Sequence, residues 1–417
     1  MSSTTANEQV DLKSYALVTA AYWGFTLTDG ALRMLVLLYF HQLGYSALEV
    51  AILFVLYEIA GVATNLIGGW IGSRFGLKIT LFSGLGLQIF ALIMLALLPA
   101  TWPQWAAVIY VMVSQALSGT AKDLTKMSSK SAIKLVVPPN AEGTLFKWVA
   151  ILTGSKNALK GVGFFLGGAL LSWVGFTAGL WIMVGGLALV LGLSSIFLKR
   201  DMGKTKQKVP FKELLSKTPA INVLSGARFF LFGARDVWFV VGLPLFLESE
   251  LGWSFTAIGT FFAAWVIGYG VIQGAAPSLF KREGKPVAHG GTSQLWVFIL
   301  AVVTAIIAVS IAFNWQVPFV IVIGLGIFGA IFAVNSSVHS FLILAYTDSD
   351  RVALNVGFYY MANAGGRLLG TVASGLLYQW FGLAACLWGS VICLVFAWAI
   401  SFKLPRTAEG DLVQAQG

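Results

Sequence analysis

The most informative stretch of this chain reads Gly154-Ser155-Lys156-Asn157-Ala158-Leu159-Lys160-Gly161-Val162-Gly163-Phe164-Phe165. The surrounding segment, residues 146–174, is mostly apolar and longer than the roughly 20 residues that a helix needs to cross a bilayer. A lysine near the centre of such a helix costs about 2.5–3.5 kcal/mol on insertion scales, so Lys160 must serve a purpose. The simplest purpose is a water-filled cavity that binds an anion, and Arg367 indicates the same in a later apolar segment.

The composition of the whole chain is that of a membrane protein. Of its 417 residues, 58% are hydrophobic and only 11% are charged, against about 25% charged in soluble domains. The net charge of +10 does not indicate nucleic acid, because basic residues also collect in cytoplasmic loops. The polar start of the chain lacks the basic region of a cleaved signal peptide, so the first apolar segment is expected to be retained.

Twelve segments are long enough to span a bilayer as helices. They run approximately over residues 15–40, 47–72, 79–99, 104–128, 146–174, 177–198, 220–247, 254–280, 292–313, 317–345, 353–379 and 383–403. The longest connection follows the sixth segment and divides the chain into residues 1–198, a linker 199–219, and residues 220–417. The sequence therefore predicts an all-α polytopic membrane protein with two pseudo-symmetric six-helix halves.

The basic residues of the connections predict the orientation. The linker carries Lys199, Arg200, Lys204, Lys206, Lys208, Lys212 and Lys217. No Lys or Arg occurs in the short connections at the other end, which are His41–Leu48, Ala100–Gln104, Gly175–Phe176, Glu248–Trp253, Asn314–Gln316 and Phe381–Gly382. By the positive-inside rule, the linker and both termini are cytoplasmic.

Two short sequences recur in both halves at nearly the same offset. Leu43-Gly44-Tyr45 matches Leu251-Gly252-Trp253 at 208 residues, and Trp173-Val174-Gly175 matches Trp380-Phe381-Gly382 at 207 residues. The second offset places Lys160 opposite Arg367 and Gly163 opposite Gly370. The two central cations are therefore predicted to be pseudo-symmetry mates.

Charged residues avoid particular segments. The third, sixth, ninth and twelfth segments contain no Asp, Glu, Lys or Arg in their apolar spans, whereas the first, second, fourth, fifth, seventh and eleventh do. We expect every third helix to face lipid and the other helices to surround a polar centre.

Within the charged segments, polar residues recur every three or four positions and so share one face of a helix. The stripes are Tyr22, Thr26, Asp29 and Arg33; Glu58, Gly61 and Asn65; Lys122, Lys126, Lys130 and Lys134; Thr153, Lys156, Asn157 and Lys160; and Asn363, Arg367, Thr371 and Ser374. Because Lys156 and Lys160 are one turn apart and repel each other, they favour an anion between them.

These stripes and the seventh segment supply the candidate site. The predicted substrate-binding residues are Arg33, Lys122, Lys126, Lys156, Lys160, Arg228, Arg235, Asn363 and Arg367. Embedded carboxylates beside cations often relay protons, and the candidates for proton coupling are Asp29, Glu58 and Asp236.

Structural interpretations of the same residues stay open. Two pairs also fit ion pairs with a purely structural role: Asp29 with Arg33, and Arg235 with Asp236. Arg228 also fits a side chain that reaches the cytoplasmic interface. Glu58 also fits a protonated acid buried for packing. Lys130 and Lys134, which follow the fourth segment, fit topology signals.

Signatures of catalysis or cofactor binding do not occur. Gly324-Leu325-Gly326-Ile327-Phe328-Gly329 matches a dinucleotide fingerprint, but it lies in an apolar helix with no preceding strand and fits helix packing instead. The chain has no Walker sequence, no metal-ligand spacing, and its two cysteines, Cys386 and Cys393, lie in one segment. We expect no enzyme, no cofactor, no metal and no nucleic-acid partner, but a monomeric carrier of a small anion in a lipid bilayer.

The loop between the second and third segments reads Gly69-Trp70-Ile71-Gly72-Ser73-Arg74-Phe75-Gly76-Leu77-Lys78. It resembles the signature G-x-x-x-D-R-x-G-R-[RK] of the major facilitator superfamily, with matches at Gly69, Arg74, Gly76 and Lys78. Ser73 replaces the usual Asp and Leu77 the usual Arg, so the family's gating ion pair is incomplete here. The resemblance implies a transporter with alternating access, in which Gly69, Arg74 and Gly76 belong to a gating loop.

Longer stretches resemble the ArsJ family of organoarsenical efflux permeases from bacterial arsenic-resistance operons. Besides the stretch quoted first, they are Leu27-Thr28-Asp29-Gly30-Ala31-Leu32-Arg33-Met34, Ala121-Lys122-Asp123-Leu124-Thr125-Lys126-Met127 and Ala227-Arg228-Phe229-Phe230-Leu231-Phe232-Gly233-Ala234-Arg235-Asp236-Val237-Trp238. The resemblance implies export across the bacterial inner membrane of 1-arseno-3-phosphoglycerate, which a partner glyceraldehyde-3-phosphate dehydrogenase makes from arsenate. The residues alone leave an antiporter of phosphate, arsenate or another organic phosphate as the alternative.

Overall fold

The computed structural model describes residues 12–75, 77–132, 142–198, 218–279, 289–347 and 352–406, and these are almost entirely helical. The helices are α1 (Leu12–Gln42), α2 (Ala47–Leu53), α3 (Val55–Phe75), α4 (Leu77–Ala96), α5 (Gln104–Ala132), α6 (Glu142–Val174), α7 (Phe176–Phe197), α8 (Pro219–Phe239), α9 (Gly242–Ser249), α10 (Phe255–Leu279), α11 (Gly290–Ala312), α12 (Val317–Phe319), the π-helical η3 (Val320–Gly324), α13 (Leu325–Ala345) and α14 (Val352–Ser401).

These helices make twelve crossings of a membrane. Within the described ranges, nine segments are long and apolar enough to span a bilayer, and one of them, Asn355–Ser401, crosses twice because α14 turns back at Gly382. The charged helices α1 and α5 complete the set. Short breaks divide two crossings into α2 with α3 and α8 with α9. A third crossing runs through α12, the π-helical η3 and α13 without a break. The predicted all-α, twelve-helix fold is confirmed. The proposed boundaries of the linker stay a prediction, because residues 199–217 lie outside the described residues.

Four turns at one end of the bundle, two in each half, share one backbone conformation. Gly44, Gly175, Gly252 and Gly382 all adopt positive φ angles, of 89°, 82°, 64° and 72°. This left-handed conformation is accessible to glycine without a steric penalty. Because these are the glycines of the two repeated tripeptides, the sequence repeat corresponds to a repeat of backbone geometry.

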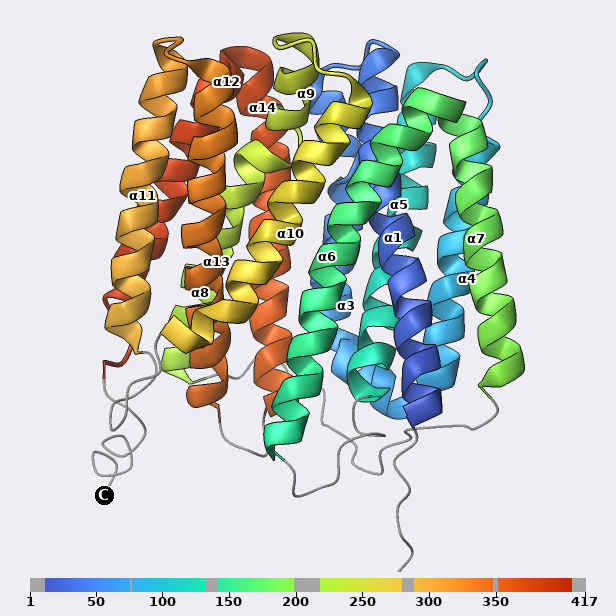
Figure 1. Cartoon of the computed structure of the whole chain (residues 1–417), viewed down its shortest axis with the longest axis horizontal. Helices are drawn as coiled ribbons and strands as arrows, with labels where there is room; N and C mark the ends of the chain where they lie inside the picture. Colours follow the sequence, from blue (N-terminus) through green and yellow to red (C-terminus); the bar gives the residue numbers. More distant parts are fainter. Residues whose placement is uncertain are drawn as a thin grey trace, which may run out of the picture.

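The two halves meet along two equivalent seams. Figure 1 shows the first six crossings, in blue to green, beside the last six, in yellow-green to red. At one seam α6 packs against α10, and at the other α3 packs against the first part of α14. Each crossing of the first half corresponds to the crossing six places later in the second half. The second crossing therefore corresponds to the eighth, and the fifth to the eleventh. A two-fold pseudo-symmetry that exchanges the halves thus also exchanges the two seams.

The helices predicted to face lipid lie on the outside. Phe90 of α4, Leu189 of α7, Ile306 of α11 and Ile392 of α14 each expose more than half of their surface. None of the described residues of α4, α7, α11 or the second part of α14 lines the central cavities. The uncharged helices α10 and α13 do line a cavity, which charge content alone does not predict.

Close helix packing positions the central cations. A Cβ atom added to Gly163 of α6 would lie 2.6 Å from the carbonyl oxygen of Leu27, and one added to Gly370 of α14 would lie 2.8 Å from that of Gly233. The absence of side chains lets α1 and α6, and likewise α8 and α14, approach each other closely. Lys160 and Arg367, three residues before these glycines, are thereby brought against the neighbouring helix.

Candidate anion-binding site

Two adjoining cavities occupy the centre of the bundle. The first, of about 230 Å³, is lined by Arg33, Arg228 and Arg235, and we call it the arginine lobe. The second, of about 160 Å³, is lined by Lys122 and Lys126, and we call it the lysine lobe. Both lobes share one boundary, made by Lys156, Lys160, Tyr360, Asn363 and Arg367.

Positive charge predominates around the lobes. Of the described residues, eight that line them are cationic: Arg33, Lys122, Lys126, Lys156, Lys160, Arg228, Arg235 and Arg367. Three carboxylates line them, Asp29, Asp123 and Asp236, and the buried Glu58 pairs with two of the arginines. Formal charges therefore leave an excess of four cations. In a poorly solvated interior, such an excess attracts anions strongly.

A chain of alternating charges crosses the arginine lobe from one half to the other. Arg33 Nη2 lies 3.1 Å from Glu58 Oε1, and Arg367 Nη2 lies 2.6 Å from the same oxygen. Arg367 Nε donates to Asp236 Oδ2 at 3.2 Å, and Arg235 Nε donates to Asp236 Oδ1 at 2.6 Å. Arg367 thus joins a carboxylate of the N-terminal half to one of its own half. The other oxygen of Glu58, Oε2, is buried without a partner among the described residues.

Each half carries the same ion pair between its first and fifth crossings. Lys160 Nζ lies 3.8 Å from Asp29 Oδ2, and Arg367 pairs with Asp236. Both residues of the first pair are 207 positions before those of the second. The repeat predicted from Lys160 and Arg367 therefore extends to their carboxylate partners.

Arg228 differs from the other arginines of the lobe because its described partners are all neutral. It donates to Asn363 Oδ1 at 3.1 Å and to Ser336 Oγ at 3.1 Å. Its guanidinium carbon lies 3.9 Å from the centre of the Phe232 ring. The side chain is almost completely buried, with 4% of the residue exposed. Arg228 is a fixed cation whose charge no described carboxylate balances.

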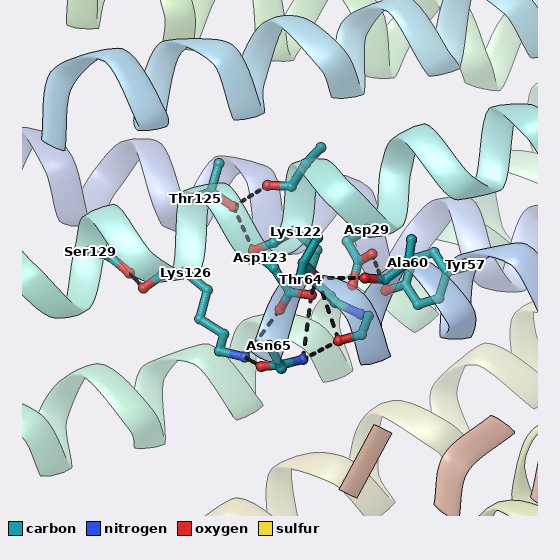
Figure 2. Close-up of polar contacts among 12 residues, drawn as sticks. Asp29, Tyr57, Ala60, Thr64, Asn65, Lys122, Asp123, Thr125, Lys126 and Ser129 are labelled. Carbon is teal, nitrogen blue, oxygen red and sulfur yellow. Dashed lines mark hydrogen bonds and ion pairs between the residues drawn. The ribbon is translucent and has the colours of Figure 1, made fainter. Parts of the chain in front are cut away.

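The lysine lobe contains a second polar network, shown in Figure 2. Lys126 Nζ of α5 donates to Asn65 Oδ1 at 2.7 Å and to Asp123 Oδ1 at 3.1 Å. Thr64 of α3 donates to the other oxygen of Asp123. Tyr57 donates to Asp29 Oδ1 at 2.7 Å and lies under Lys122, whose Nζ is 4.0 Å from the ring centre.

The structure corrects part of the sequence interpretation and adds to it. Arg33 pairs with Glu58 of α3, and Asp29 with Lys160, so Asp29 and Arg33 are not partners. Glu58 is an ion-paired acid rather than a packing residue, and Arg228 points into the arginine lobe. Asp123 was not among the candidates, although its position three residues before Lys126 is a sequence signal for an ion pair.

Several predicted residues cannot be placed. The predicted gating-loop residue Gly76 lies outside the described residues, as does Lys134. Gly69 and Arg74 belong to the end of α3, and Lys130 to α5, but their side chains lie outside the described part of the chain.

The two halves also contact each other at the end of the bundle where the turns at Gly44 and Gly252 lie. His41 Nε2 at the end of α1 lies 3.0 Å from Ser249 Oγ and 3.2 Å from Glu248 Oε2 at the end of α9. The backbone N–H of Leu48 donates to Gln379 Oε1 at 3.0 Å. These contacts bring the first half against the second at that end.

A bundle of lipid-facing helices around a buried charged cavity is the architecture of a multi-pass membrane transporter of small molecules, not of an enzyme. A comparison with protein families matches residues 18–290, more than half of the chain, to the Major Facilitator Superfamily. The chain belongs to this superfamily. A comparison with curated proteins finds no significant match.

Solved transporter structures share the fold. A bacterial homologue of the iron transporter ferroportin in its inward-facing state superimposes with a TM-score of 0.70 at 15% identity, over 95% of this chain and 99% of that one. The outward-facing state of a bacterial ferroportin homologue gives 0.67 at 16% identity, over 94% and 99%. A POT family transporter in complex with a thioalcohol-conjugated peptide gives 0.69 at 12% identity, over 93% and 95%. At these identities the likeness concerns the fold alone.

Proposed function

We propose that the protein exports a two-ended organic oxyanion, and specifically an organoarsenical phosphate ester such as 1-arseno-3-phosphoglycerate. The observation that carries this proposal is the pair of adjoining lobes with an excess of positive charge. A molecule with a phosphate at one end and an arsenate ester at the other can place one group in each lobe. Arginine forks match tetrahedral oxyanions, and lysines supply point charges. The choice of an arsenical rests on the resemblance to the ArsJ family.

The cavity's position supports alternating access. Both lobes lie between the two halves, where substrates of such folds generally bind. At the boundary of the lobes, Arg367 pairs with Glu58 and Asp236, and Lys160 pairs with Asp29. An anion that binds to Arg367 or Lys160 therefore competes with these carboxylates. Proton uptake by such a displaced carboxylate is the route that we propose for coupling to protons.

The cellular setting follows from the same proposal. The linker's basic residues favour a cytoplasmic linker and cytoplasmic termini in a bacterial inner membrane. The carrier would work as a monomer, and glyceraldehyde-3-phosphate dehydrogenase would supply its substrate. An antiporter of phosphate, arsenate or another organic phosphate is the second candidate, because the lobes' chemistry suits any of these anions.

Uptake by everted membrane vesicles tests the proposed substrate. We expect labelled arsenate to accumulate only when glyceraldehyde-3-phosphate dehydrogenase, its triose phosphate and NAD⁺ are present, because the ester and not arsenate has two anionic ends. Vesicles without the transporter are the control. Equal accumulation of arsenate without the dehydrogenase would support the second candidate instead.

Replacing Asp29 by asparagine is expected to make the transport rate independent of an imposed pH gradient. Asp29 lines the lysine lobe and pairs with Lys160 there, whereas asparagine cannot bind and release a proton. Uptake into vesicles at several pH gradients measures the effect. If the rate of the variant still follows the gradient, Glu58→Gln and Asp236→Asn become the next variants to compare.

A further inference from the structure

We propose that the arginine lobe also binds aryl-substituted oxyanions, in which a phosphonate or arsonate head group carries an aromatic ring. This inference uses the anion site of the proposed function but goes beyond its substrate. It rests on the aromatic part of the wall, which a fully polar triose ester does not need.

Besides Tyr360 at the boundary of the lobes, six further aromatic side chains share this lobe with the arginines. They are Phe164, Phe232, Phe239, Phe262, Trp265 and Tyr269. They come from α6, α8 and α10, and therefore from both halves. A site that combines apolar rings with a few placed cations suits a ligand with an apolar body and an anionic head.

The rings form a continuous, fixed surface around Phe239. The centre of the Phe239 ring lies 4.8 Å from those of Phe262 and Trp265, and 6.3 Å from that of Phe164. Trp265 is held by a 2.7 Å hydrogen bond from its indole N–H to the carbonyl of Leu325. A wall that is already ordered costs little entropy when a ligand binds.

Phe239 is the accessible member of this cluster. Phe164, Phe262 and Trp265 are buried, whereas Phe239 is only partly buried although it lies inside the bundle and lines the lobe. A ring used only to fill space between helices would be covered on all sides. The exposed part of Phe239 can therefore accept an aromatic ring in offset or edge-to-face contact.

Head group and ring would each find a partner at the same place. The guanidinium carbon of Arg235 lies 5.6 Å from the centre of the Phe239 ring and 4.9 Å from that of Phe232. An oxyanion attached directly to a ring can thus contact an arginine while its ring lies against Phe239. The glycerate backbone of the triose ester has no ring and offers these aromatic side chains only one CH and one CH₂ group.

Two phosphonates with the same head group test the proposal. Binding of phenylphosphonate and methylphosphonate to the purified full-length protein would be measured by calorimetry, at a pH high enough that both are dianions. We expect phenylphosphonate to bind about tenfold more tightly. In Phe239→Leu the preference should fall to less than threefold, while the affinity for methylphosphonate should stay within twofold of the wild type.

A matched variant and a second ring variant make the outcomes decisive. Phe230 belongs to α8, as Phe239 does, but its ring stacks on Phe396 with 5.2 Å between the ring centres and does not line the lobe. Phe230→Leu should therefore keep the tenfold preference for phenylphosphonate. Phe262→Leu should lose the preference for phenylphosphonate. Binding of methylphosphonate reports whether each variant is folded. Equal affinity of the wild type for both phosphonates, or a preference that survives both Phe239→Leu and Phe262→Leu, overturns the inference alone. If neither phosphonate binds, the anion site of the proposed function fails with it.

Discussion

Replacing Arg228 by glutamine is expected to weaken the binding of inorganic phosphate roughly 30-fold or more, while the protein keeps its fold. Arg228 is buried beside neutral groups, Ser336 and Asn363, so its charge is available to an anion. Losing one partner of a buried charged contact costs about 2–5 kcal/mol of binding free energy, which corresponds to a factor of about 30 or more. Isothermal calorimetry on the purified protein measures the change.

The fold should survive this substitution because no described carboxylate loses a partner. Arg406→Gln is a matched control, since Arg406 is exposed and donates only to Gln294 among the described residues; its phosphate affinity should equal that of the wild type. Arg228→Lys keeps the charge but loses the planar guanidinium that can donate two parallel hydrogen bonds to an oxyanion, and it should give an intermediate phosphate affinity. Unchanged phosphate binding in Arg228→Gln, with an unchanged melting temperature, would remove Arg228 from the site.

Replacing Arg367 by glutamine is expected to abolish transport and to destabilise the protein by about 3–5 kcal/mol. Arg367 is the central link between Glu58 and Asp236. Without it, each of these buried carboxylates keeps only one arginine, and the ionic link from Glu58 to Asp236 is lost. Vesicle uptake and thermal unfolding of the purified protein measure the two effects separately.

The double variant Arg367→Gln with Glu58→Gln separates structure from function. It removes one charge of each sign, so part of the lost stability should return, while transport should stay absent because the site has lost a cation. An unchanged melting temperature in Arg367→Gln would contradict the structural role of this residue.

Much of the fold could be predicted because its causes are local. Length and hydrophobicity identify a membrane helix wherever it packs, so the twelve segments agree with the observed helices to within a few residues at most ends. The glycines of the repeated tripeptides, such as Gly44 and Gly252, mark equivalent turns because only glycine adopts their positive φ without penalty. Polar stripes likewise follow from the helical period.

The partners of the charged residues could not be predicted in the same way. Asp29 and Arg33, one turn apart, satisfy the local rule for an ion pair, yet Arg33 pairs with Glu58 and Asp29 with Lys160. Glu58 and Arg367 are 309 residues apart in the chain. Their contact depends on how α3 and α14 cross, which helix periodicity does not contain. The aromatic wall of α6, α8 and α10 could not be predicted for a similar reason, since the rings that line a cavity look in the sequence like part of any apolar span.

The sequence by itself determined that this chain spans a membrane twelve times, repeats at an offset of about 207, and carries cations where only a polar cavity tolerates them. The offset follows from the recurring tripeptides. The crossings and the need for a cavity follow from the cost of placing each residue in lipid, which is a property of the residue and its neighbours along the helix. Only the tertiary structure decided which cations are neutralised and which remain for a ligand. Arg367 is bound to two carboxylates and Arg228 to none among the described residues, because pairing depends on distances of a few ångströms between helices that are remote in the chain.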